Sequence, residues 1–200
     1  MVDHFLNNPL AILIVVGSYF LGSIPFGLLF TKWGGKGDLR TVGSGNIGAT
    51  NVLRTGSKFL ALSTLIFDGL KGYAAVYLGE KFQVQDFAAG AVILGHMFPV
   101  WLKFKGGKGV AVYSGILFGL SVPLGAQAVL AWVSFALIFG YSSLAALLTA
   151  ILVPLTVWIW SYGEPLLYIT SILSFLLIIK HHENIGRLIK GKEPKVGAKK

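Results

Sequence analysis

The sequence predicts an all-α integral membrane protein with seven transmembrane helices. Its 200 residues are 54% hydrophobic and only 12% charged, and a mean hydropathy of +0.73 is too apolar for a water-soluble domain of this size. The formal net charge is +9, but the basic residues gather in short stretches between apolar segments, as in the cytoplasmic loops of membrane proteins. This placement favours contact with membrane lipid, and we expect no nucleic-acid partner. Cysteine is absent, which excludes disulfides, thiolate metal sites and a cysteine nucleophile.

A transmembrane helix needs about 20 consecutive apolar residues. The eight leading residues, MVDHFLNN, carry no Lys or Arg, so we interpret the first apolar segment as a retained span and not as a cleaved signal. The region from 110 to 140 is too long for one ordinary span and short for two. The other segments of sufficient length lie at residues 9–30, 59–78, 82–102, 144–160 and 164–180.

The basic clusters decide how often the region 110–140 crosses the membrane. Lys and Arg cluster after the first, the third and the last apolar segments. If the region crosses twice, with a break around 122–125, all three clusters lie on one face. The positive-inside rule then predicts seven spans, with the N-terminus outside and the C-terminus cytoplasmic. We interpret residues 1–200 as a single polytopic membrane domain.

Two charged residues lie inside the second segment. Asp68 and Lys71 are three residues apart and share one helical face, where unpaired charges would be costly. We expect a mutually neutralising pair that faces the interior of the bundle, and a direct role toward substrate is the alternative. His96, in the third segment, is expected to donate a hydrogen bond to a backbone carbonyl.

The first of three polar stretches is TVGSGNIGATNVLRTGSK, at residues 41–58. Glycine lets backbone N–H groups turn toward a ligand, and the start of a helix adds a positive dipole, so this stretch suits a phosphate. A capped turn is the alternative interpretation. The polar side chains that support phosphate binding are Thr41, Ser44, Asn46, Thr50, Asn51 and Arg54.

The second polar stretch is KFKGGKGVA, at residues 103–111. It is not a Walker A loop, because the GxxxxGK[ST] pattern is absent. Its glycines allow a ligand to approach the backbone closely, and Lys108 adds a charge at the start of the next helix. A stop-transfer cluster would explain the lysines, but it would not explain Gly106, Gly107 and Gly109.

The third polar stretch is HHENIGRLIKGKEPK, at residues 181–195. A helical start places His181 and Asn184 on one face, with Arg187 near them. His181 can act as a general base or donate a hydrogen bond to a phosphate. The spacing of the His and Glu residues does not match a helical metal-binding pattern, so we expect no metal ion.

Three anion-binding stretches on one membrane face suggest two anionic reactants. Like unit charges about 4 Å apart repel by roughly 4 kcal/mol at an effective dielectric constant of 20, so such reactants meet only where cations offset the repulsion. Ser142 and Ser143, in the short turn before the sixth span, are further candidates for this site. No covalent nucleophile is evident, which favours direct transfer between two bound substrates. A transporter or flippase for a phosphorylated solute would use the same anion sites and is the alternative.

Three motifs resemble those of the bacterial membrane acyl-phosphate:glycerol-3-phosphate acyltransferases, the PlsY family. The stretch SGNIGATNVLR at 44–54 resembles the first motif, and GHMFP at 95–99 with FKGGKGVA at 104–111 resembles the second. The third motif is matched by H, NI, RL, G and E within residues 181–193. The resemblance covers the whole chain in length, order and spacing.

The resemblance implies seven spans in a bacterial inner membrane. It also implies transfer of a fatty acyl group from acyl phosphate to the sn-1 hydroxyl of glycerol 3-phosphate, with no cofactor and with an upstream enzyme that forms acyl phosphate. An acyl-CoA donor is disfavoured, because no histidine of the chain begins a His-x4-Asp pattern. The implied catalytic residues are Ser44, Arg54, Lys108, His181 and Asn184. The implied glycerol 3-phosphate contacts are Ser44, Arg54, His181 and Asn184, and the polar side chains of the first stretch add Thr41, Asn46 and Thr50 as candidates. The implied acyl phosphate contacts are Gly106, Gly107, Lys108 and Gly109, and Glu193 is implied to be structural.

Overall fold

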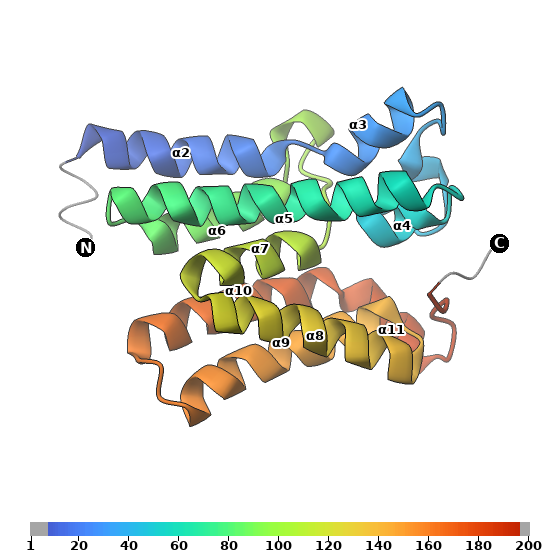
Figure 1. Cartoon of the computed structure of the whole chain (residues 1–200). Coiled ribbons are helices and arrows are strands. Elements are labelled where there is room, and N and C mark those ends of the chain that lie inside the picture. The colour runs from blue at the N-terminus through green and yellow to red at the C-terminus, as the bar shows by residue number, and fades with distance from the viewer. Residues whose placement is uncertain (1–7, 197–200) are drawn as a thin grey trace.

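The structure is a computed structural model that describes residues 8–196. All the regular secondary structure in these residues is helical. Residues 1–7, in the predicted retained amino terminus, and residues 197–200, at the end of the basic tail, lie outside the described part. In Figure 1 the long helices run nearly parallel, and α3, α4 and α11 lie at one end of the bundle. In chain order the helices are α2 (Pro9–Ser23), α3 (Phe26–Trp33), η1 (Leu39–Thr41), α4 (Ala49–Leu53), α5 (Lys58–Lys81), α6 (Gln85–Met97), η2 (Val100–Leu102), α7 (Val110–Leu120), α8 (Val122–Phe139), α9 (Ser142–Ile159), α10 (Glu164–Lys180) and α11 (His182–Ile189).

The first apolar segment, predicted as one helix, is two helices. α2 and α3 meet at an angle of 41° around Ile24 and Pro25. A proline disfavours helical backbone at the residue before it, and Ile24 accordingly has an extended backbone with φ of −67° and ψ of 115°. The break directs α3 toward the first polar stretch, where a Cβ at Gly27 would lie only 2.0 Å from the carbonyl oxygen of Ile47.

The region 110–140 contains two helices, as the distribution of basic residues predicted. α7 ends at Leu120 and α8 begins at Val122, with Pro123 in its first turn. The third segment is shorter than predicted, because α6 ends at Met97. Pro99 cannot donate the backbone hydrogen bond that would continue the helix, and the chain turns instead into η2.

Three helices of the described part, α5, α8 and α9, are long and apolar enough to cross a membrane, and the number rises to five if the bent pairs α2–α3 and α10–α11 each form one span. α6 and α7 have 13 and 11 residues, fewer than the roughly 20 of an ordinary span. Seven crossings and their orientation therefore stay predictions. Large apolar side chains face outward on α8, where Leu130 is 67% and Leu137 81% exposed.

Glycines bring α5 and α7 into backbone contact at the centre of the bundle. A Cβ at Gly115 would lie 1.9 Å from the carbonyl oxygen of Gly69, and a Cβ at Gly72 would lie 2.4 Å from that of Val112. Small residues allow this close approach in membrane helix pairs generally. The contact fixes the start of α7, and with it Lys108, beside α5.

The charged residues inside α5 form the expected buried pair. Lys71 Nζ lies 2.7 Å from Asp68 Oδ1, and both side chains are almost completely buried. Lys71 Nζ also donates to the carbonyl oxygen of Ile24 at 3.0 Å and to His96 Nδ1 at 2.9 Å. The predicted bond from His96 to a backbone carbonyl is therefore wrong, because the imidazole pairs with the ammonium of Lys71.

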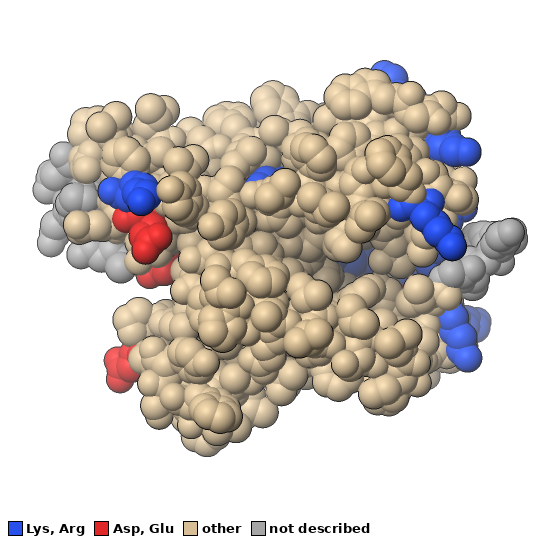
Figure 2. All heavy atoms as spheres, viewed as in Figure 1, with Lys and Arg blue, Asp and Glu red and all other residues tan. Residues whose placement is uncertain are grey.

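Charged side chains divide between the two ends of the bundle. Figure 2 shows Lys and Arg gathered at the end where Figure 1 places α3, α4 and α11, whereas Asp and Glu gather at the other end beside one basic cluster. Glu80 and Lys81 lie in the last turn of α5, and Asp86 and Glu164 lie in the first turns of α6 and α10. The side of the bundle seen between the two ends carries almost no charge.

Candidate functional site

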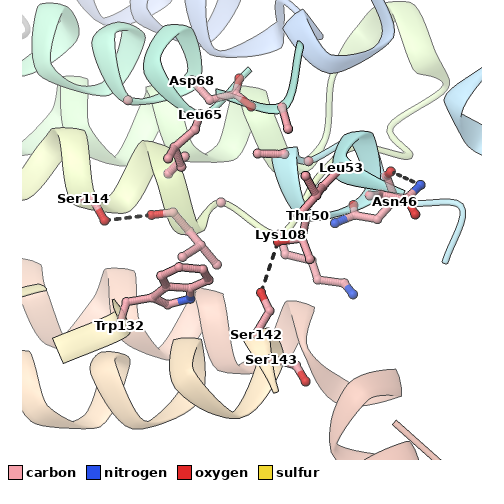
Figure 3. A pocket seen from close by; sticks show the side chains of 18 of the residues that line it. Asn46, Thr50, Leu53, Leu65, Asp68, Lys108, Ser114, Trp132, Ser142 and Ser143 are labelled. Carbon is pink, nitrogen blue, oxygen red and sulfur yellow. Dashed lines mark hydrogen bonds between the residues drawn. The ribbon is translucent and has the colours of Figure 1, made fainter. Parts of the chain in front are cut away.

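A cavity of about 880 Å³ lies where the three polar stretches meet. Arg54, Lys108 and His181 line its polar end. Leu65 of α5 and Trp132 of α8 project toward it from opposite sides and belong to its apolar end, as Figure 3 shows. The cavity thus joins a cationic compartment to an apolar cleft between membrane helices.

The amide of Asn51, on α4, holds the first polar stretch in shape. Its side chain is buried, and Nδ2 lies 3.1, 2.9 and 2.8 Å from the carbonyl oxygens of Leu39, Val42 and Asn46. Its Oδ1 accepts a hydrogen bond from the backbone N–H of Ser44 at 3.2 Å. The stretch is therefore wrapped around one amide, which places Ser44 and Asn46 at the cavity wall.

Arg54 brings a positive charge to the cavity from the end of α4. Its Nη1 donates to Asn51 Oδ1 at 3.2 Å, and it forms no ion pair with any carboxylate of the described residues. Thr50, one turn earlier, has its Oγ1 3.1 Å from Ser142 Oγ, which ties the stretch to the start of α9. A guanidinium without a carboxylate partner can bind a phosphate through two parallel hydrogen bonds.

The glycine-rich stretch docks on the C-terminal end of α6. The N–H groups of Gly106 and Gly107 donate to the carbonyl oxygens of Met97 and His96 at 3.2 and 3.0 Å. A Cβ at Gly107 would lie 2.1 Å from His96 Nε2, so the position requires glycine. Neither Gly106 nor Gly107 lines the cavity, and their N–H groups are already used inside the protein. Gly109, with φ of +86°, then turns the chain into α7.

Lys108 lies at the polar end of the cavity, directly before α7. Its Nζ donates at 2.5 Å to Asn184 Oδ1, a neutral acceptor. Lys108 forms no ion pair with a carboxylate of the described residues. Burial, together with the nearby Arg187, lowers the pKa of the Lys108 ammonium from 10.5 to about 8. An anion bound in the cavity would stabilise the charged form.

His181 lies at the 60° bend between α10 and α11. Its side chain is buried, and Nδ1 is 2.8 Å from the carbonyl oxygen of Leu177. A carbonyl can only accept a hydrogen bond, so Nδ1 carries the proton and Nε2 carries the lone pair. Burial lowers the pKa of His181 from 6.5 to about 4, and the imidazole is therefore neutral at pH 7.

Glu193 connects the third polar stretch to α9. Its Oε1 accepts hydrogen bonds from Ser143 Oγ and Asn184 Nδ2, both at 2.6 Å, and its Oε2 accepts one from Arg187 Nε at 2.7 Å. Burial alone would raise the pKa of the Glu193 carboxyl, but these hydrogen bonds lower it below its usual value. Because Asn184 Nδ2 donates to Glu193, the Oδ1 atom of Asn184 faces Lys108.

Most of the residues predicted for the site line this one cavity. Thr41 does not, because it is exposed and its hydroxyl donates to the carbonyl oxygen of Asp38 at 2.9 Å. The predicted residues that line the cavity are Ser44, Asn46, Thr50, Arg54, Lys108, Gly109, Ser142, Ser143, His181, Asn184 and Glu193. Within residues 8–196, no group of three or more His, Cys, Asp or Glu side chains is placed to hold a metal ion.

The sequence did not reveal that Asn51 organises the first polar stretch. It showed Asn51 only as one of several polar side chains in that stretch. One signal was available, because asparagine has a poor helix propensity and Asn51 stands beside the apolar Val52 and Leu53. An amide in such a place is expected to be buried with its neighbours and to bond to nearby backbone groups.

Comparison with known proteins identifies the family. The sequence profile of the family described as glycerol-3-phosphate acyltransferase matches residues 12–191. The chain belongs to this family. Glycerol-3-phosphate acyltransferases of Mesorhizobium japonicum and Brucella anthropi are 50% and 51% identical to it, over 94% and 98% of this chain and 97% of each relative. The resemblance seen in the three motifs is thus confirmed.

Solved structures of PlsY, an integral membrane glycerol 3-phosphate acyltransferase, share the fold of this family member. The glycerol 3-phosphate form gives a TM-score of 0.88 at 38% identity, over 94% of this chain and 96% of that one. The lysophosphatidic acid form gives a TM-score of 0.86 at 36% identity, over 92% and 94%. This acyltransferase is accordingly an integral membrane protein, as its composition predicted.

Proposed function

We propose that this protein transfers a fatty acyl group from an acyl phosphate to the sn-1 hydroxyl of glycerol 3-phosphate, releasing lysophosphatidic acid and phosphate. Membership of the family supports acyl transfer to glycerol 3-phosphate. The observation that carries the choice of donor is the cavity, in which two cations without carboxylate partners, Arg54 and Lys108, lie at one end of an apolar cleft.

The two cations correspond to the two phosphates of the proposed reactants. Arg54 and the stretch around Asn51 form the compartment for glycerol 3-phosphate. Lys108 and the start of α7 form the compartment for the acyl phosphate, where the unpaired N–H groups of a helix N-terminus add positive potential. In this assignment Gly106 and Gly107 give the loop its shape, and the donor phosphate meets Lys108 and Gly109.

The apolar end of the cavity is the proposed site of the fatty acyl chain. Leu65 and Ile66 of α5, Phe118 of α7 and Trp132 and Val133 of α8 line it. A fatty acyl chain that enters this end of the cavity moves from the apolar lipid to an apolar protein surface, so its transfer costs little hydrophobic free energy. The carbonyl carbon is then placed at the junction with the polar end.

Direct transfer is proposed because none of the hydrogen bonds formed by the described cavity serines pairs a serine hydroxyl with a histidine, as a serine nucleophile would require. Ser142 Oγ pairs with the hydroxyl of Thr50, Ser143 Oγ donates to Glu193, and no hydrogen bond joins either serine to His181. The sn-1 hydroxyl of glycerol 3-phosphate therefore attacks the acyl carbonyl, and phosphate leaves with the electrons of the broken C–O bond. Holding the reactants together contributes about 7–11 kcal/mol to lowering the barrier.

His181 is proposed to orient the attacking hydroxyl through Nε2. Its lone pair is available at neutral pH, but a pKa of about 4 makes the imidazole a weak base. A substrate phosphate, with a second pKa of about 6, is the stronger base and takes the proton. Asn184, fixed by Glu193, keeps Lys108 beside the departing phosphate.

We further propose seven spans in one membrane domain of the bacterial inner membrane, with the cavity on the cytoplasmic face. The separation of basic and acidic ends in Figure 2 supports this orientation through the positive-inside rule. Acyl phosphate is an activated donor, so the reaction requires no cofactor. It does require a partner enzyme upstream that forms the acyl phosphate.

The test is acyl transfer by the purified protein in detergent, with acyl phosphate and acyl-CoA offered separately. Lysophosphatidic acid and released phosphate are both measured. We expect equal amounts of the two products from acyl phosphate and none from acyl-CoA. Lys103→Asn is the matched control for Lys108→Ala, because Lys103 is an exposed lysine of the same stretch, its φ is +50°, and asparagine tolerates that backbone. Transfer from acyl-CoA alone would contradict the proposed donor.

A further inference from the structure

The proposed reaction does not use the buried polar cluster formed by Asp68, Lys71 and His96. The Lys71 ammonium has three partners: it donates to the Ile24 carbonyl oxygen at 3.0 Å and to His96 Nδ1 at 2.9 Å, and it forms an ion pair with Asp68 Oδ1 at 2.7 Å. These partners belong to the break between α2 and α3, to α6, and to α5. Lys71 therefore joins three elements of the bundle.

The imidazole of His96 links this cluster to the glycine-rich stretch. Its Nδ1 accepts from Lys71, which fixes the direction of the ring. The opposite edge of the ring faces Gly107, where a Cβ would lie 2.1 Å from Nε2, and the backbone carbonyl of His96 accepts from the N–H of Gly107 at 3.0 Å. Gly107 thus rests on both the side chain and the backbone of His96, and Lys108 is the next residue.

We propose that Asp68, Lys71 and His96 are positioning residues that hold the His96 ring as a seat for Gly107 and thereby place Lys108 in the donor compartment. The inference rests on the proposed function for the assignment of Lys108 to the donor phosphate. Asp68 and His96 line the cavity, but a carboxylate repels a phosphate, so the cluster acts through the loop.

The energetics of buried charges favour a positioning role over a purely stabilising one. A buried ion pair is often no more stable than well-packed apolar residues of the same volume, because its attraction must first offset the desolvation of both charges. Its geometry is much more restrictive, since the hydrogen bonds have preferred lengths and directions. A single orientation of the His96 ring is what the loop needs, because Gly107 has no side chain of its own with which to hold its place.

A double-mutant cycle tests the contact between His96 and Gly107. The variants are His96→Ala, Gly107→Ala and the double variant, and the control is Gly90→Ala, on the same helix, where a Cβ meets nothing within 4 Å. We expect each single variant to lower kcat/KM for the donor about 100-fold, because a misplacement of about 1 Å has an effect of this size. The double variant should be no worse than the more severe single variant, because His96→Ala removes the ring that the added methyl group of Gly107→Ala strikes. Multiplicative losses, about 10,000-fold in the double variant, would overturn the proposal.

A second variant tests the charged part of the cluster without leaving one charge unpaired. Asp68→Leu with Lys71→Met removes both charges, and the control is Gln127→Met with Thr156→Val, a hydrogen-bonded pair at 2.6 Å between α8 and α9. We expect the first pair to lower kcat/KM for the donor at an unchanged KM for glycerol 3-phosphate, and the control pair to change neither. The positioning role would be refuted if Asp68→Leu with Lys71→Met left the kinetics unchanged, as the control pair should. It would also be refuted if this variant unfolded at the wild-type temperature and raised the KM values for donor and acceptor equally.

Both experiments use whichever donor supports transfer by the wild-type protein. A wild type that accepts only acyl-CoA would overturn the proposed donor, while the cycle would still decide whether His96 and Gly107 act as one unit. Failure of the proposed function and failure of the positioning role are therefore separate results.

Discussion

The ionisation of Lys108 should control how transfer depends on alkaline pH. Burial and the nearby Arg187 lower the pKa of the Lys108 ammonium to about 8, and a lysine is charged below its pKa. Only the charged form offsets the donor phosphate, so kcat/KM for acyl phosphate should be near its maximum at pH 7 and fall as the pH rises through 8. One unit above the pKa about a tenth of the free enzyme keeps the proton, so we expect about a tenfold loss at pH 9 and about a hundredfold loss at pH 10.

The variant Lys108→Arg separates this ionisation from other effects of pH. Arginine stays charged across the whole range, so its profile should lack the alkaline fall. Its plateau should be lower than that of the wild type, because the guanidinium cannot reproduce the bond from Nζ to Asn184 Oδ1. The control Lys103→Asn should keep the wild-type fall, because Lys103 does not line the cavity.

The assay is steady-state kcat/KM for acyl phosphate from pH 6 to 10 at glycerol 3-phosphate well below its KM, with enzyme-free samples to correct for donor hydrolysis, and kcat is measured separately at saturating glycerol 3-phosphate. Because kcat/KM reports the free enzyme, its midpoint should lie near 8, whereas the midpoint of kcat should be higher, since the bound phosphate stabilises the ammonium. An alkaline fall of the same midpoint in Lys108→Arg would refute the assignment of this pKa. A wild-type profile that is flat to pH 10 would refute it as well.

Three further predictions concern the remaining cavity residues. Arg54→Ala should cost about 2–5 kcal/mol in kcat/KM for glycerol 3-phosphate, because it removes a desolvated partner of the acceptor phosphate; near-wild-type kinetics would show that this phosphate binds elsewhere. Asn184→Asp should lower the transfer rate more than Asn184→Ala, because the new carboxylate neutralises Lys108 and repels Glu193, and like charges about 4 Å apart repel by roughly 4 kcal/mol. Initial rates of the two variants test this order, and a slower Asn184→Ala would contradict it. His181 binds a proton in the unfolded chain below pH 6.5 but in the folded protein only below about 4, so stability should fall as pH drops from 6.5 to 4, by up to about 3 kcal/mol. His181→Gln should flatten this slope in thermal unfolding measured in detergent, and an unchanged slope would exclude His181 as its source.

The sequence predicted those helices whose limits are set by local signals. α10 begins at Glu164 and ends at Lys180, as predicted, because turn-forming residues precede it and a charged stretch follows it. The limits of α2 and α6 were missed because hydrophobicity was counted without weighing Pro25 and Pro99, which interrupt apolar runs through their backbone chemistry.

The sequence could predict which residues belong to the site, but it could not predict which of them face a ligand and which support the loops. Glycine content alone does not distinguish a loop whose N–H groups face a ligand from one whose N–H groups dock on a neighbouring helix. Gly106 and Gly107 are of the second kind, because their N–H groups donate to the carbonyl oxygens of Met97 and His96 at the end of α6. Only the folded structure reveals this pairing. The same holds for His96, whose partner Lys71 lies 25 residues away in sequence.

The cavity keeps its positive charge because its two essential cations are held by neutral amides. Asn51 Oδ1 holds Arg54 and Asn184 Oδ1 holds Lys108, so neither charge is neutralised before a substrate arrives. Glu193, a carboxylate that lines the cavity beside them, accepts hydrogen bonds from three donors and directs its charge mainly to Arg187. A site with carboxylates in place of the two amides would be equally well ordered, but it would have no net attraction left for two phosphates. The amides therefore provide order without neutralisation, which is the property that bringing two like-charged reactants together requires.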